Sequence, residues 1–433
     1  MAADLEVAEV YGMRTVSFET QIYDGQVDEY TVSVVQGVSL RGRYNERVAS
    51  CYTEVFDDEA VDQLISGIKR ASSVIDITDL ELFQPGGDVY TPVATFSEEL
   101  EGITAEQKIE AARRMEIAAL NADACVKQCD SCSIMTSLET TVLQNSLGLS
   151  LSSKSNVLFA ICGVVIEDTE SLISDFDVRG FHNFCELNPE LIGVKTVEKA
   201  KLKMGSASIR SGNIPVIFSH EAMVDLLAPY QIMFDAEQAQ LGLSLLSDKE
   251  GQDIFSPLIT ITDDPHHGLN LRSFDDEGVP TTKIDIVSRG AFITFMHNLR
   301  TARKAGIKST GHAVRSYKSA IGIGASNLYI HPQDYTLTDL LKLMNNGLFI
   351  TNLVGTHAGT NPISGDFSLL CNGMLVENGV TTRPVDRITV AGNFLIMMKN
   401  LVAVGNDLEF HPVAGSIGSP SIYVGELSIA GEE

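Results

Sequence analysis

The stretch IPVIFSHEAMVDLL, residues 214–227, marks the point at which the chain changes its pattern. Its first five residues form an apolar run that is typical of a short strand. Ser219 can then cap a helix by accepting a hydrogen bond from a backbone N–H of the first turn. Ala228-Pro229 predicts an early end to that helix, because the residue before a proline is pushed out of the helical region. The stretch therefore predicts a strand that leads directly into a short helix.

The sequence differs in character on the two sides of this stretch. Upstream, Asp24-Gly25 separates two runs rich in Val, Thr and Tyr, which predicts a hairpin. Downstream, short strand-like runs alternate with Gly, Asn, Asp and Pro turns. We therefore expect an α+β fold, with an N-terminal mixed α/β domain at residues 1–205 and a mainly antiparallel β-rich C-terminal domain at residues 206–433. Helices are expected near residues 58–72, 104–122, 189–203, 298–305 and 337–346.

The longest apolar run, residues 157–166, predicts a strand that is buried on both faces and lies centrally in its sheet. It is far shorter than the ~20 residues that a membrane helix needs. The N-terminal residues lack the basic and apolar regions of a signal peptide, so we expect a cytoplasmic protein. The net charge of −26 argues against binding to nucleic acid or to an anionic membrane, since phosphate binding needs clustered Lys and Arg.

Three of the seven cysteines, Cys125, Cys129 and Cys132, have a spacing that can hold an iron–sulfur cluster. They fall in a predicted strand after an Ala-rich helix, where cysteine usually packs as a small hydrophobe. We therefore expect no cluster there.

His220-Glu221 opens the helix of the central stretch and indicates zinc chemistry. An imidazole binds zinc, and a nearby carboxylate takes the proton from zinc-bound water. The common short motif has a second His at i+4, but here that position is Val224, and Asp225 follows it. The pattern begins as in a zinc peptidase and is not completed. The alternative is a polar helix cap with an ordinary His beside a Glu.

From Ser244 onward, a series of ordered segments resembles the TldD/PmbA family, also described as modulators of DNA gyrase and as peptide-maturation proteins. The most distinctive segment is FDDEGVPT at residues 274–281, and a looser match, NSLG at residues 145–148, lies in the N-terminal half. The other segments are ITITDDP (259–265), TAR (301–303), STGHAVR (309–315), SNLY (326–329), SGDFS (364–368), VENG (376–379), ITVAGN (388–393) and VGND (404–407).

The resemblance implies a family with two branches. The TldD branch resembles a zinc peptidase with His-Glu-x-x-x-His and a Cys in Gly-x-Cys-Gly, whereas the PmbA or TldE branch lacks the full ligand set and pairs with TldD. Here Asp225 stands where the second His would be, and Ile417 stands where the Cys would be. Since zinc sites need at least three protein ligands, His220 and Asp225 alone leave the set incomplete. We expect no cofactor. Zinc is expected only if an unforeseen third ligand completes the set, with Glu221 then acting as the catalytic base.

The acidic run Asp275-Asp276-Glu277 admits two interpretations. It is either a hard-cation site or a turn in which the carboxylates cap backbone N–H groups beside Gly278. The resemblance places this loop beside the family's cleft, which makes the three acidic residues candidates for substrate binding. His312 and Arg315 are further candidates, because a charged fork can hold a peptide carboxylate. A salt bridge inside the fold is the alternative for these two.

The leading function hypothesis is a PmbA/TldE-type subunit of a metallopeptidase system that acts in proteolysis and peptide maturation. It would hold an extended peptide by strand addition, and would pair with a TldD-type subunit or with a second copy of itself. One alternative is that the chain is itself an active zinc metallopeptidase. Another is a non-catalytic regulator that binds a large partner such as DNA gyrase. The sequence identifies neither the peptide nor the pathway, and leaves homodimer and heterodimer open.

Overall fold

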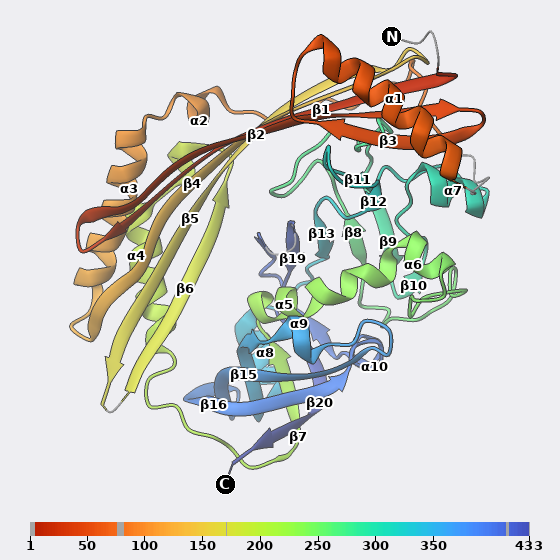
Figure 1. The fold of residues 1–433 in the computed structure, drawn as a ribbon. Helices are drawn as coiled ribbons and strands as arrows, with labels where there is room; N and C mark the ends of the chain where they lie inside the picture. The colour runs from red at the N-terminus through yellow and green to blue at the C-terminus, as the bar shows by residue number, and fades with distance from the viewer. Residues whose placement is uncertain (1–4, 76–81, 170, 413–414, 433) are drawn as a thin grey trace.

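The computed structural model describes residues 5–75, 82–169, 171–412 and 415–432, and shows an α+β fold (Figure 1). An N-terminal part built on one large sheet is followed by a C-terminal part of smaller sheets. The N-terminal elements are β1 (Val7–Tyr23), β2 (Gln26–Tyr44), β3 (Arg47–Thr53), α1 (Asp58–Val74), α2 (Glu98–Gly102), α3 (Ala105–Ala122), β4 (Val126–Asn145), β5 (Ser150–Asp168), β6 (Ser171–Phe181) and α4 (Pro189–Lys201).

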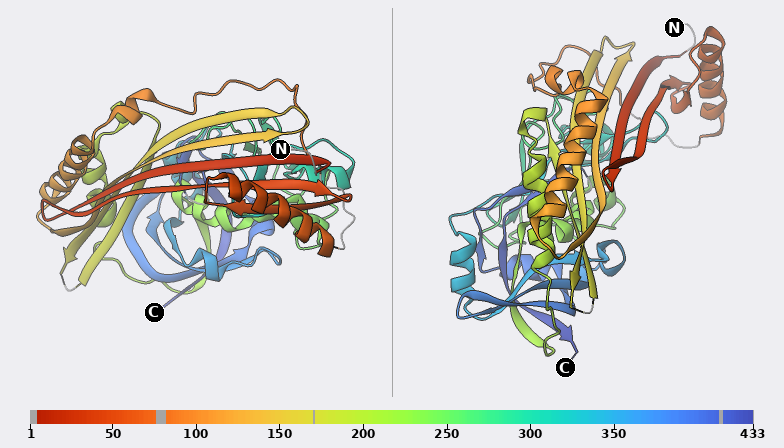
Figure 2. Two further views of the ribbon diagram at one scale, coloured as in Figure 1. Left: turned by 45° about the horizontal axis from the view of Figure 1, so that its top comes forward. Right: turned by 90° about the vertical axis from the view of Figure 1, so that its left-hand side faces the viewer.

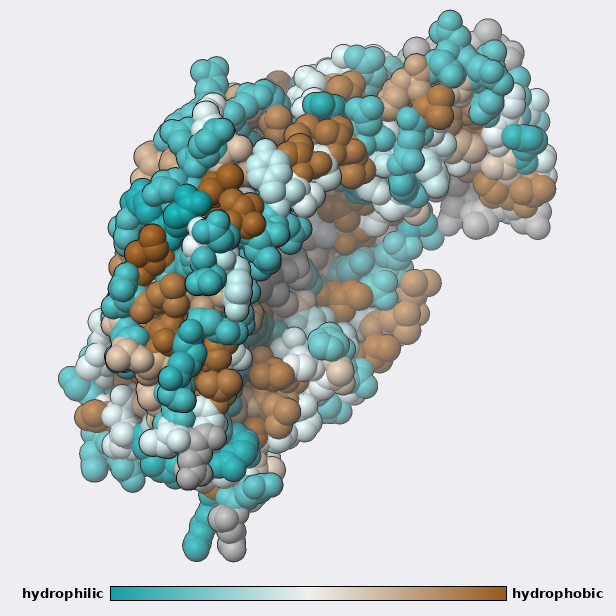
Figure 3. Space-filling view, turned by 60° about the vertical axis from the view of Figure 1, so that its left-hand side comes forward, coloured by the Kyte–Doolittle hydropathy of each residue, from teal (hydrophilic) through white to brown (hydrophobic). Residues whose placement is uncertain are grey.

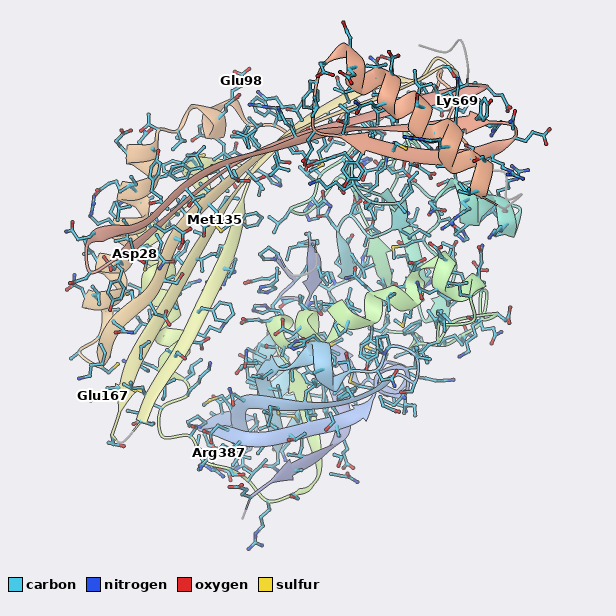
Figure 4. All side chains as sticks on the ribbon, in the orientation of Figure 1. Asp28, Lys69, Glu98, Met135, Glu167 and Arg387 are labelled. Atoms are coloured by element: carbon cyan, nitrogen blue, oxygen red, sulfur yellow. The ribbon has the colours of Figure 1, made fainter. Side chains whose placement is uncertain are left out.

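The N-terminal sheet is antiparallel, with strand order β3-β2-β1-β4-β5-β6. Its long strands run from the end that carries α1, where Figure 4 labels Lys69, to the end that carries α3 and α4, where it labels Asp28. The predicted hairpin is confirmed: Asp24 and Gly25 have φ values of 49° and 72°. Two consecutive left-handed residues form the turn whose twist matches that of the flanking strands.

Helices α3 and α4 cover one face of the sheet, and the other face is turned toward the C-terminal part (Figures 1 and 2). Helix α3 begins with a capping box, in which the hydroxyl of Thr104 accepts from the N–H of Gln107. This satisfies a backbone donor that would otherwise lack a partner in the helix. Met115 of α3 packs with Ile134 and Leu158 of the sheet in one buried cluster. Burial of these apolar side chains holds the helices on the sheet.

Three features of the N-terminal part and of the central stretch differ from the sequence-based expectation. The apolar run of residues 157–166 lies in β5, which is next to the edge strand and leaves alternate residues only half-buried. Strand β6 was not predicted, because Asp175, Asp177 and Arg179 interrupt its apolar residues. The helix after Ser219 passes through Pro229 and ends at Tyr230, where a proline in the last turn costs few hydrogen bonds.

The C-terminal part contains two six-stranded sheets, with orders β10-β9-β8-β13-β19-β18 and β16-β15-β14-β7-β20-β17, and the small pair β11-β12. Most of its pairings are antiparallel; β7 with β14 and β13 with β19 are parallel. Its strands are β7 (Gly212–Phe218), β8 (Ile261–Asp263), β9 (Ile284–Ser288), β10 (Ala291–Phe292), β11 (Ala313–Val314), β12 (Gly322–Ile323), β13 (Leu328–Ile330), β14 (Gly347–Val354), β15 (Asp366–Glu377), β16 (Val380–Asn393), β17 (Ala403–Val404), β18 (Glu409–His411), β19 (Ile417–Ser419) and β20 (Ile422–Gly431).

The helices of this part are α5 (His220–Tyr230), α6 (Ala236–Gln240), α7 (Leu299–Ala305), α8 (Leu337–Met344), α9 (Thr356–Gly359) and α10 (Phe394–Asn400). Helix α5 is packed into the main C-terminal core, and its N-terminus faces the space between the two parts (Figure 1). Strand β7 ends at Phe218, immediately before the Ser219 cap. Because β7 lies between two other strands, it holds the first residues of α5 in a fixed place.

The structure also bears on two expectations from composition, which concern the cysteines and membrane-spanning helices. Cys129 and Cys132 lie buried in β4, where they belong to the apolar cluster between the sheet and its helices. Within the described ranges, no helix combines the length and the apolar character needed to cross a bilayer.

Candidate functional site

A cavity of about 860 Å³ lies between the N-terminal sheet and the C-terminal part. One wall is β6, through residues 174–178, and the opposite wall includes Glu221 and Asp225 of α5 and the end of β14. His411 of β18 also lines it. Figure 4 shows side chains from both parts projecting into this space, and Figure 3 shows the hollowed face between the sheet and the C-terminal part. The cavity brings together chemical groups that are far apart in the sequence.

Two histidines and a glutamate gather at one side of the cavity. The Nδ1 of His220 lies 3.0 Å from the Nε2 of His411 and 3.9 Å from a carboxylate oxygen of Glu409. The ligand atoms of the three residues all lie within 4.8 Å of one another. Burial, and then the nearby His220, lower the pKa of His411 to about 4, so this imidazole is neutral at pH 7. A neutral imidazole next to a carboxylate is a set of groups able to ligate a metal ion.

Arg179 of β6 joins this cluster to the N-terminal sheet. Its guanidinium donates to Glu409 at 2.7 Å and to Asp177 at 2.9 Å. Burial alone would raise the pKa of Glu409, but His220 and Arg179 outweigh it and lower that pKa. Glu409 is therefore a carboxylate at neutral pH, held in place from the opposite wall of the cavity.

Glu221 points to a different partner. Its carboxylate accepts from the ammonium of Lys199, on α4 of the N-terminal part, at 2.5 Å. Asp225 lies one helical turn further along α5, on the same face. Burial, and then the neighbouring Glu221 charge, raise the pKa of Asp225 to about 7, although Lys199 opposes the shift. Lys199 thus pairs with Glu221 and lies 3.8 Å from Asp175 of β6, and its charge also acts on the neighbouring Asp225.

The predicted substrate-binding residues lie elsewhere, at a second junction between the two parts. The Asp275 carboxylate accepts backbone N–H groups of Glu277, Val279 and Ala313, with Gly278 at φ 84°, as in the capped turn. Three further contacts complete this junction: Asp276 accepts from the N–H of Arg315, the Arg315 guanidinium pairs with buried Glu9 at 3.1 Å, and Glu277 accepts from the N–H of Leu299.

His312 is also buried, with its Nε2 3.1 Å from Asp263. None of these five candidates (Asp275, Asp276, Glu277, His312 and Arg315) is among the residues that line the 860 Å³ cavity. Their part in substrate binding stays a prediction, and their contacts within the fold are structural.

Comparison with known proteins gives this arrangement a family. Three domain models described as PmbA/TldA metallopeptidase match the chain: domain 1 at residues 8–73, the central domain at 98–204 and the C-terminal domain at 211–431. The chain belongs to the PmbA/TldD metallopeptidase family. The sequence-based resemblance is thereby confirmed.

Among relatives, the metalloprotease PmbA of Escherichia coli O157:H7 is 30% identical over 82% of this chain and 74% of its own length. A Thermotoga maritima crystal structure described as a candidate modulator of a DNA gyrase matches with a TM-score of 0.91 at 31% identity, covering 98% of this chain and 96% of that one. The crystal structure of TldE from Thermococcus kodakarensis shares the fold, with a TM-score of 0.89 at 23% identity over 98% and 97% of the two chains.

The zinc ligands that the TldD branch of the family implies do not fit this chain. Ile417, at the position of the sulfur ligand, is buried in β19 and has no donor atom. Asp225, at the position of the second His, is not part of the cluster around His220. Of the predicted pair His220 and Asp225, the structure brings only His220 together with other groups able to ligate a metal.

Sequence reasoning missed Glu409, His411, Arg179 and Lys199. Glu409 and His411 alternate along a short strand, so they share one face of it, and this i, i+2 pattern was the available signal. Nothing in the local sequence indicated that this strand faces His220, which is 191 residues away.

Proposed function

We propose that this chain is the PmbA/TldE-type subunit of a TldD/PmbA peptidase system, acting in the cytoplasm, and that it binds extended peptides in its cavity without cleaving them. The observation that carries the proposal is the ion pair between Glu221 and Lys199. A general base must reach the proton that it abstracts, and this carboxylate is instead held by the ammonium group of Lys199 on α4. The zinc-ligand set that the family resemblance implies is also incomplete at two positions, because Asp225 stands in place of the second His and Ile417 in place of the sulfur ligand.

Strand β6 supports peptide binding by strand addition. It is the last strand in the order of its sheet, and none of the described strands pairs with its outer edge. The same strand forms one wall of the cavity, where the side chain of Phe176 is 59% exposed. An edge strand offers unpaired N–H and C=O groups to an extended peptide, and an exposed aromatic ring adds apolar contact. One carbonyl, that of Phe176, is already occupied by Lys199 at 3.1 Å.

Strand β2 supports pairing with another subunit. Residues 26–36 are all exposed, and among the described strands β3 pairs with β2 only from Val38 onward. This free edge carries several large apolar side chains, and long apolar edges of this kind invite pairing with a second chain. The exposed apolar residues are Val27, Tyr30, Val32, Val34 and Val35. The partner is a TldD-type subunit or a second copy of this chain.

Peptide binding is tested with fluorescently labelled unstructured peptides and their backbone N-methylated analogues. We expect N-methylation to weaken binding at least tenfold, because strand addition depends on main-chain donors. Phe176→Ser should weaken binding too, whereas Phe56→Ser, an equally exposed Phe outside the cavity, should not. Equal affinity for methylated and unmethylated peptides contradicts strand addition.

The absence of a catalytic role is tested in the complex with a TldD-type subunit. Glu221→Gln should leave peptide hydrolysis by the complex within a few-fold of wild type. If the chain is itself the peptidase, the same change removes the general base and lowers the rate by ~10²–10⁴-fold. That loss, with the fold intact by circular dichroism, rejects the proposal.

A further inference from the structure

We propose that His220, Glu409 and His411 form a binding site for a divalent transition-metal ion, of which zinc suits the ligand set best. The site goes beyond the proposed peptide-binding role and does not depend on it, because Glu221 is paired with Lys199 and a bound ion alone does not supply a general base. It also differs from the expectation of no cofactor, because only one of its three residues belongs to the ligand set considered from the sequence. Two imidazoles and a carboxylate are typical ligands of zinc, whereas calcium and magnesium prefer oxygen ligands alone.

The distances within the cluster suit one shared ion. The nitrogen atoms of His220 and His411 are 3.0 Å apart, and their ring centroids are 5.2 Å apart. Two imidazole nitrogens on a tetrahedral zinc, each about 2.0–2.1 Å from the ion, lie about 3.3 Å from one another. The same geometry separates the two ring centroids by about 5 Å. In the present arrangement the two nitrogens point almost straight at each other, so each ring has to turn by roughly 35° before both lone pairs converge on one ion, which then replaces the N–H···N hydrogen bond.

The strand register places the donors together. Glu409 and His411 are two residues apart on β18, so both side chains leave the same face of the strand. His411 is directly opposite Ile417 of β19, and opposite residues in an antiparallel pair lie side by side. The imidazole of His411 thus lies beside Ile417, whose side chain has no atom that could bind a metal. Helix α5 brings His220 to the same point from the other side.

The surroundings hold the ligands and leave access for an ion. Arg179 binds Glu409 at 2.7 Å and is itself paired with Asp177, so the three charged groups leave one net negative charge beside the imidazoles. Groups that bind a metal ligand in this way fix its orientation. The side chain of His220 is 24% exposed, and His411 lines the cavity, so a fourth coordination position faces solvent or a cavity ligand.

The experiment is zinc binding to the full chain after treatment with a chelator. Wild-type protein, dialysed free of metal, is titrated with zinc sulfate against a coloured chelator of known affinity. We expect one zinc ion per chain, and at least tenfold weaker binding in His411→Ala and in Glu409→Gln. Cobalt substitution should give the visible absorption of a site with nitrogen ligands, and each variant should lose it.

Two matched variants separate this ligand set from others. Asp225→Asn should bind zinc as wild type does, and so should His357→Ala, which removes an exposed histidine of α9. Glu409 is partly exposed, so Glu409→Gln decides the question even if His411→Ala does not fold. Zinc binding that is lost in Asp225→Asn, or that is no tighter in wild type than in Glu409→Gln, overturns the proposal.

Discussion

Replacing Asp225 by Asn should change how the stability of the protein depends on pH. The pKa of this carboxyl is raised from its ordinary value of 3.8 to about 7, chiefly by burial and by Glu221. Between these two values the folded protein holds a proton that the unfolded chain releases. The stabilisation from the protonated form is therefore present at low pH and is lost as the pH rises toward 7. Asn has nearly the same shape and no proton to lose, so the variant should not show this loss.

The size of the effect follows from the shift. Three pKa units correspond to about 4 kcal/mol over the whole range, since each unit is worth about 1.36 kcal/mol. Most of the stability that is lost between pH 5 and pH 8 is lost below pH 7. We expect the free energy of unfolding of wild type to fall by about 2.5 kcal/mol relative to that of Asp225→Asn over that interval. Asp225 is only partly exposed, which justifies using the shift with little correction for solvent screening.

The assay is urea unfolding followed by far-UV circular dichroism at pH 5, 6, 7 and 8, with a chelator present so that metal binding does not contribute. Asp62→Asn, which removes an exposed carboxylate of α1, serves as the control for loss of one negative charge. A stability difference between wild type and Asp225→Asn that is constant from pH 5 to pH 8 refutes the reasoning.

Three further variants test separate parts of the fold. Arg315→Met removes a guanidinium partner of buried Glu9, which also pairs with Arg41, and calorimetry should show that the free energy of unfolding falls by about 3 kcal/mol because a buried carboxylate keeps less compensating charge. Tyr230→Phe removes a buried hydroxyl that donates to the carbonyl of Asp366 at 2.8 Å, and should cost about 1–2 kcal/mol in urea unfolding. Thr104→Ala removes the N-cap of α3 and should cost about 1 kcal/mol, with faster amide exchange in its first turn.

Local signals in the sequence predicted much of the fold. The Asp24-Gly25 turn, the Thr104 capping box and the Ser219 cap each depend on residues a few positions apart, and the structure has all three. Strand β6 was missed because it has charged residues at alternate positions. These residues suit the wall of a cavity, but the local sequence does not indicate that a cavity lies there. The parallel pairing of β7 with β14 joins segments far apart in the chain, and such pairings are set by the packing of the whole core.

The candidate site likewise combines residues that could be predicted from the sequence with residues that could not. His220 and Glu221 are adjacent, so their chemistry was visible in the sequence. The partners that decide what they do, His411 and Lys199, come from β18 and α4. Lys199 arrives from the other part of the molecule, and its pairing with Glu221 depends on how the two parts meet. Spacing along the chain carries no information of that kind.

The pairing of β7 has a consequence for synthesis on the ribosome. All strands of the N-terminal sheet lie between residues 7 and 181, so the sheet can assemble as soon as that length has emerged, although β1 has to wait for β4. Strand β7 has to wait for both of its neighbours, β14 and β20, and β20 ends at Gly431. The N-terminus of α5, and His220 with it, therefore takes its final place only after the chain has been synthesised beyond Gly431. Until then β7 and its apolar residues are exposed, and a nascent chain of this protein should engage chaperones late rather than early.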